Sequence, residues 1–289
     1  MEERNHLSGF VWGMLGVLCF SLTLPATNVA VQYFNSIFVG LGRTIPASLL
    51  AVLFLIINKQ PVPAKKQFRD LFIIAFGAVL IFPLLTTYAM ADLPVSHGAV
   101  ELALLPLATA FFAMIIANER PGLKFWIASS IASLSVIIYA FTLGLGTIHL
   151  ADMALIVSVI ILGLSYAMGA KLAKEIGSWQ TIAWSVIIGA PLFFIPVIRS
   201  IRVEEILAAP ISGWVSFIYL AVISQFLAYI FWYKGLSVGG ISKVSQLQYL
   251  QPFLMITFSF LFLNEVFNLY TIIIAVVTVS CVIIGKNAA

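Results

Sequence analysis

Residues 106–119 read PLATAFFAMIIANE, and residues 252–265 read PFLMITFSFLFLNE. Each segment starts with a proline, continues as an apolar run and ends on Asn-Glu, and the two copies are 146 residues apart in a chain of 289 residues. We interpret this match as an internal duplication in which each copy occupies one half of the chain. If each copy crosses a membrane an odd number of times, the second copy enters the membrane upside down.

The composition places almost the whole chain inside a membrane. Hydrophobic residues make up 62% of the sequence and charged residues 9%, whereas charged residues are about 25% of a soluble domain. The two cysteines, Cys19 and Cys281, both fall in apolar stretches, so the sequence predicts neither a disulfide framework nor a metal cluster. We read the formal net charge of +4 as a signal of topology and expect no nucleic-acid partner.

Ten apolar stretches are long enough to cross a bilayer, which takes about 20 residues per helix. They cover residues 8–33, 36–58, 70–91, 94–117, 121–143, 150–173, 178–198, 211–235, 239–263 and 266–286. With the amino terminus inside, eleven Lys and Arg residues fall in the inward loops and only Arg199 and Arg202 in the outward loops. This asymmetry predicts that both termini are cytoplasmic.

The predicted fold is therefore an all-α polytopic membrane protein with ten transmembrane helices in two inverted five-helix repeats. The repeats are expected to cover residues 1–145 and 146–289. Pro106 and Pro252 interrupt the fourth and ninth spans, either as packing bends or as hinges. Gly9 and Gly13, at four-residue spacing, predict a close contact between helices.

Around the duplicated segments, the sequence resembles the EamA domains of the drug/metabolite transporter superfamily. The matching residues run from Tyr88-Ala89-Met90 through Pro106 to Asn118-Glu119-Arg120, and from Trp232-Tyr233-Lys234-Gly235 through Pro252 to Asn264-Glu265. The resemblance implies ten helices, inverted repeats, a central cavity, and export or exchange of small metabolites such as amino acids. It does not indicate which metabolite.

Arg43 and Glu101 are opposite charges predicted to share one depth in the membrane. Each lies seven residues into a span that starts outside, or about 10 Å from the outer end. A charge at a helix centre costs about 2.5–3.5 kcal/mol, so each needs a partner or a water-filled cavity. Two hypotheses stay open. The residues form a structural ion pair, or both face the cavity and hold the two ends of a zwitterion such as an amino acid.

A third hypothesis is that Glu101 couples transport to proton movement, because intramembrane carboxylates often take part in proton transfer. His97 lies one helical turn before Glu101 and shares its helix face. It is either a relay to Glu101 or a solvated capping residue near the outer interface.

Aromatic and amide side chains complete the predicted binding site. On the third, sixth and eighth spans, side chains that could recognise an aromatic or cationic solute, or simply pack between helices, are Tyr88, Tyr166, Gln225, Tyr229, Trp232 and Tyr233. On the ninth span, Lys243 lies near the inner membrane face, where its side chain can reach water as an anchor. Alternatively, Lys243, Gln246 and Tyr249 recur at helical spacing and could form one water-facing stripe. The superfamily resemblance implies that this span borders the cavity, with spans one, three, four, six and eight as the other expected walls.

The motifs of other function classes do not occur in the sequence. It contains no nucleotide-binding loop, metal-ligand cluster or nucleophile elbow, so we expect no cofactor, no metal and no enzymatic activity. A channel would repeat like charges or a filter motif around a pore. The leading hypothesis is a transporter of a small solute in a bacterial-type cytoplasmic membrane, with proton or counter-solute coupling left open. The alternatives are a broad-specificity drug exporter and an intramembrane enzyme that uses Glu101 and His97.

Overall fold

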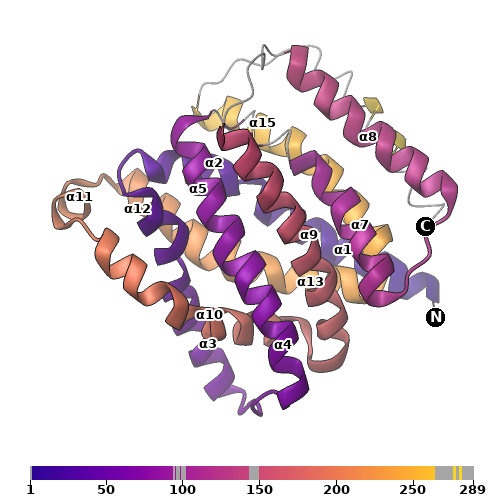
Figure 1. The fold of residues 1–289 in the computed structure, drawn as a ribbon, viewed down its shortest axis with the longest axis horizontal. Helices are drawn as coiled ribbons and strands as arrows, with labels where there is room; N and C mark the ends of the chain where they lie inside the picture. The colour runs from indigo at the N-terminus through magenta and orange to yellow at the C-terminus, as the bar shows by residue number, and fades with distance from the viewer. Residues whose placement is uncertain are drawn as a thin grey trace.

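All regular secondary structure described in the computed structural model is helical (Figure 1). The described residues are 2–93, 95, 98, 102–142, 150–263, 276, 277, 280 and 281. Within them the all-α class is confirmed. Four residues of the sequence analysis, His97, Glu101, Asn264 and Glu265, lie outside the described part of the chain, as does nearly all of the predicted tenth span. The count of ten spans therefore stays a prediction.

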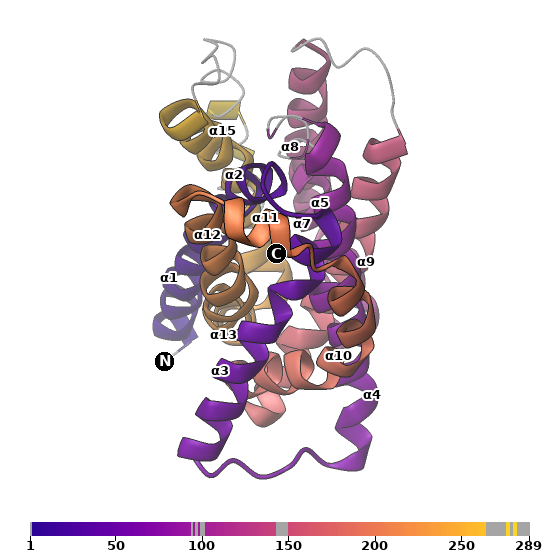
Figure 2. The ribbon, with the colours of Figure 1, turned by 90° about the vertical axis from the view of Figure 1, so that its left-hand side faces the viewer.

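The helices of the first copy follow the predicted spans one to five. They are α1 (Glu2–Ser21), α2 (Thr23–Val31), the π-helix η1 (Phe38–Gly42), α3 (Thr44–Ile57), α4 (Lys65–Ile74), the π-helix η2 (Ala75–Ile81), α5 (Phe82–Asp92), the 3₁₀-helix η3 (Leu102–Leu104), α7 (Leu105–Ala117) and α8 (Leu123–Thr142). Figure 2 shows α3 and α4 joined by the connection 58–64 at the bottom of the view, where Lys59 lies, in one of the predicted inward loops.

The helices of the second copy follow predicted spans six to nine. They are α9 (Leu150–Ile176), α10 (Ser178–Ser200), the short α11 (Val203–Ala208), α12 (Ile211–Ile218), the π-helix η4 (Tyr219–Leu227), α13 (Ala228–Gly239), α14 (Ile241–Ser245), the 3₁₀-helix η5 (Gln246–Leu250) and α15 (Gln251–Leu263). Among the described residues, six helical stretches are long and apolar enough to cross a membrane, namely Leu7–Val31, Phe38–Ile57, Lys65–Asp92, Leu150–Ile176, Ser178–Ser200 and Ile211–Gly239.

Two departures from α-helical geometry recur in both copies. Shifting η2 by the 146-residue offset gives 221–227, which lies inside η4, and shifting η3 gives 248–250, which lies inside η5. Pro106 and Pro252 follow the two 3₁₀ segments closely. They lack the N–H that an α-helix would donate to the carbonyls of Leu102 and Gln248. The turn before each proline is therefore free to tighten into 3₁₀ geometry, a frequent feature of hinges.

Glycines bring α1 of the first copy into close contact with α13 of the second. A Cβ atom on Gly9 would lie 2.4 Å from the Cα atom of Gly239, and a Cβ atom on Gly235 would lie 2.5 Å from the backbone nitrogen of Gly13. A larger side chain at this crossing would push the two backbones apart. The close contact predicted for Gly9 and Gly13 is confirmed.

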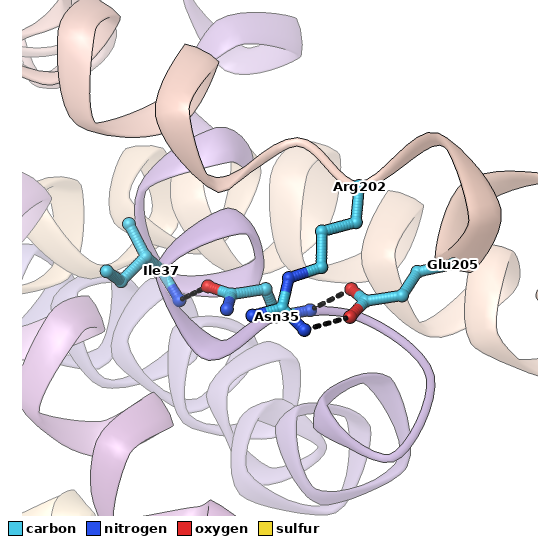
Figure 3. A network of polar contacts seen from close by, with 4 residues as sticks. All are labelled: Asn35, Ile37, Arg202 and Glu205. Atoms are coloured by element: carbon cyan, nitrogen blue, oxygen red, sulfur yellow. Dashed lines mark hydrogen bonds and ion pairs between the residues drawn. The ribbon is translucent and has the colours of Figure 1, made fainter.

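A carboxylate at one end of the bundle ties the second copy to the first (Figure 3). The backbone N–H of Asn35, which follows α2, donates to Oε2 of Glu205 at 2.8 Å, and Nη1 of Arg202 donates to Oε1 of Glu205 at 3.2 Å. Oδ1 of Asn35 accepts from the N–H of Ile37 at 2.9 Å. In the predicted topology this end is outside.

Glu119 makes a comparable tie at the opposite end, where Gly9 of α1 contacts Gly239 of α13. The N–H groups of Ile241 and Ser242 donate to its two carboxylate oxygens at 2.7 Å each. Gly240 turns the chain into α14 with a φ of +92°. Lys243 lines a pocket of about 190 Å³ beside Glu119.

Candidate functional site

Four aromatic side chains from α9 and α13 form a buried cluster in the middle of the bundle. The ring of Tyr166 lies 5.5 Å from that of Trp232 and 5.9 Å from that of Tyr229, and Tyr229 lies 5.5 Å from Tyr233. Phe20 of α1 closes one side with its ring 5.0 Å from Tyr229. The three α13 residues are three and four positions apart, which places them on one helix face. The structure thus brings together the predicted residues Tyr166, Tyr229 and Trp232.

Arg43 of the first copy lies beside this cluster. It lies between the π-helix η1 and α3, is 1% exposed, and has its guanidinium group within electrostatic range of Tyr229. The Tyr229 hydroxyl donates to the carbonyl of Ala78 in η2 at 3.2 Å. Within the described residues, Nε and Nη1 of Arg43 have no hydrogen-bond partner. Its predicted partner Glu101 lies outside them, so the Arg43–Glu101 pair stays a prediction.

Several buried polar atoms around the cluster also lack partners. Gln248 is 1% exposed and adjoins Tyr166, yet neither its Oε1 nor its Nε2 has a hydrogen-bond partner in the described part of the chain. The same holds for Nε2 of Gln225, Nε1 of Trp232 and the hydroxyl of Tyr233. Buried polar groups are normally hydrogen-bonded. Such a concentration of unpaired groups in one place is typical of a site that binds a polar molecule.

Gln246 and Tyr249 have partners on α8, which lies at the upper right edge of the bundle in Figure 1. Ser129 donates to Oε1 of Gln246 at 3.2 Å, and the Tyr249 hydroxyl donates to the Ser129 carbonyl at 2.8 Å and lies 3.1 Å from the Ser133 hydroxyl. In the 3₁₀-helix η5, residues three apart are eclipsed. Gln246 and Tyr249 therefore share the side that faces α8, whereas Gln248 adjoins the aromatic cluster.

Gln248 was not singled out as a binding residue from the sequence. The available signal was the three glutamines and one tyrosine within residues 246–251, in the first half of an otherwise apolar span. A helical wheel with 3.6 residues per turn groups Gln246 with Tyr249 but cannot show which face of the span meets the cluster. That choice depends on how the span packs.

Tyr88 lies on the lateral surface and is 44% exposed. It borders an apolar groove of about 580 Å³ between α5 and the start of α9, lined also by Leu84, Leu85, Met153 and Val157. The structure places this predicted binding residue outside the buried cluster.

The cavity next to Tyr166 is small. Its volume is about 10 Å³, enough for roughly one water molecule. The walls come from predicted spans one, three, four, six and nine, and include Phe20, Thr23, Phe82, Leu102, Tyr166 and Gln251. A metabolite does not fit into this cavity as the described residues form it.

Comparisons with known proteins give one consistent result. The EamA-like transporter family matches the chain twice, at residues 7–141 and 149–285. The uncharacterized transporter YdeK of Bacillus subtilis (strain 168) is 36% identical over 98% of both chains. YdfC of the same organism, also an uncharacterized transporter, is 21% identical over 92% of this chain and 86% of its own. A crystal structure with 14% sequence identity superposes with a TM-score of 0.74 over 98% of this chain and 99% of the other, which shows a shared fold.

Proposed function

Because the chain belongs to the EamA-like transporter family, we propose that it is a secondary transporter that moves amino acids or related amines by alternating access. The protein is a multi-pass membrane transporter; the substrate class, the mechanism and the membrane are our proposal. We place it in the bacterial cytoplasmic membrane with both termini inside, where it exports its solute or exchanges it for another.

The main observation in support of a substrate site is the group of unpaired polar atoms around the aromatic cluster. Leaving a buried donor or acceptor unsatisfied costs about 1–3 kcal/mol. Arg43, Gln225, Trp232, Tyr233 and Gln248 together present seven such atoms among the described residues. A solute with its own donors and acceptors offsets this cost by pairing with them, while the ring faces pack against its apolar part. Arg43 comes from the first copy and the other four residues come from the second.

Alternating access is supported by the way the two copies pack. The first span contacts the eighth through α1 and α13, and the sixth contacts the third through α9 and α5. These two pairings are equivalent under the repeat, as expected for inverted halves that rock about a shared site. The paired π and 3₁₀ segments lie on spans that line this site and supply points where helices can bend.

Solute counterflow in proteoliposomes tests the proposal. The purified chain is reconstituted into proteoliposomes, which are loaded with unlabelled amino acids, nucleobases, polyamines or a lipophilic cation. Uptake of the matching labelled compound into the proteoliposomes is then measured. We expect counterflow of an amino acid or related amine. Counterflow of lipophilic cations alone would support a broad drug exporter, and chemical conversion of a compound without counterflow would support an enzyme. Either result overturns the proposal.

A further inference from the structure

We infer that the solute carries a carboxylate group and that this carboxylate is the counter-ion of Arg43. The inference rests on the proposed transport function and narrows it. Amino acids and other organic acids fit the site, whereas amines without a carboxylate do not.

The burial of Arg43 requires an anion. The guanidinium group stays charged in proteins because it does not give up its proton, and a buried charge without a partner is strongly unfavourable. Arg43 is 1% exposed and lies inside the membrane-spanning stretch Phe38–Ile57. Tyr229 lies within electrostatic range of Arg43, but a neutral tyrosine carries no formal negative charge and cannot be its counter-ion.

Two of the described carboxylates at helix ends are engaged elsewhere. Glu119 accepts from the N–H groups of Ile241 and Ser242, and Glu205 accepts from Asn35 and Arg202. In the described part of the chain, no ion pair reaches Arg43. The counter-ion must therefore come from outside these residues, and a carboxylate on the solute is the candidate that also explains the other unpaired atoms.

The chemistry around Arg43 matches a small organic acid. A planar guanidinium group binds a carboxylate with two parallel hydrogen bonds, which fixes its orientation. Arg43 lies within electrostatic range of Tyr229, the Tyr229 ring contacts that of Tyr166, and Tyr166 adjoins Gln248. The unpaired Oε1 of Gln248 can accept a hydrogen bond from the amino group of the same solute. The rings between the two ends offer an apolar surface for the solute's side chain.

The ligand arm of the test compares acids with their neutral derivatives. The melting temperature of the purified chain is measured with the proteinogenic amino acids, their carboxamides, nucleobases and polyamines, and the stabilising compounds are assayed for counterflow. We expect an amino acid, and a loss of at least about tenfold when its carboxylate becomes a carboxamide, because a charged hydrogen bond is lost. Equal counterflow of acid and carboxamide, or counterflow of a polyamine or nucleobase alone, overturns the inference but leaves a transporter. Absence of any counterflow overturns both proposals.

The variant arm separates a solute counter-ion from a structural ion pair with Glu101. Arg43→Met keeps an apolar stem and removes the charge, so we expect an equal or higher melting temperature together with loss of counterflow. Arg69→Met is the matched control, because the Arg69 side chain is 83% exposed, and it should change neither. A melting temperature that falls in Arg43→Met and recovers when Glu101→Gln is added identifies a structural pair and overturns the inference. Wild-type counterflow by Arg43→Met overturns it as well.

Discussion

Tyr229 connects the charged and aromatic parts of the site. Its ring contacts Tyr166 and Tyr233, its hydroxyl donates to the carbonyl of Ala78, and it lies within electrostatic range of Arg43. The carbonyl of Ala78 belongs to the π-helix η2, where the regular hydrogen-bond pattern is shifted. One side chain thus joins the cation, the rings and an irregular backbone segment.

Tyr229→Phe tests this role at the level of a single hydroxyl. Loss of one buried hydrogen bond costs about 1 kcal/mol, so we expect a small fall in melting temperature and about a fivefold loss of counterflow. Tyr219→Phe is the matched control, because the Tyr219 hydroxyl also donates to a carbonyl, that of Cys19, outside the cluster. It should show a comparable stability change with wild-type counterflow. Equal transport by the two variants would contradict a binding role for the Tyr229 hydroxyl.

At the scale of helices, a single carboxylate fixes the start of the ninth span. Glu119 follows the end of α7 and receives two backbone N–H groups at the start of α14. These N–H groups have no partner within their own helix, and a negative charge near them is favourable. Glu119 thereby joins the fourth span of the first copy to the ninth span of the second.

Glu119→Ala should lower the free energy of unfolding by about 2 kcal/mol, because two hydrogen bonds to a charged group are lost. Thermal unfolding in detergent measures this change. Glu204→Ala is the control: Glu204 lies in the short helix α11, which has no buried residues. The expected control result is an unchanged melting temperature. If both variants melt alike, Glu119 does not hold the ninth span.

Across the whole molecule, the distribution of positive charge predicts the orientation in the membrane. The connection 58–64 and the segment around Val203 lie in loops that the sequence assigns to opposite sides. Val62 is 70% exposed and Val203 is 63% exposed, so both positions can be labelled.

Val62→Cys and Val203→Cys, each introduced into a chain with Cys19 and Cys281 replaced by alanine, test this topology. In intact cells we expect a membrane-impermeant maleimide to label the cysteine at position 203 and not the one at position 62. Permeabilised cells provide the control, since both cysteines should then react. Labelling of both positions, or of position 62 alone, in intact cells would refute cytoplasmic termini in the proposed topology.

The amino-acid sequence alone determined the membrane class, the duplication and the family. These follow from the lengths of apolar runs and from motifs at a fixed offset, which are properties of the chain and need no packing information. The prolines at positions 106 and 252 also marked where both copies tighten into 3₁₀ geometry, because a missing N–H acts locally.

Only the tertiary structure decided which polar side chains meet. Tyr166, Tyr229 and Trp232 gather beside Arg43, whereas Tyr88 borders a lateral groove, and Gln246 and Tyr249 bind α8. Periodicity tells which residues share a helix face but not which neighbour that face meets. The rotation of each helix about its axis is set by close packing, as at the glycine contact between α1 and α13.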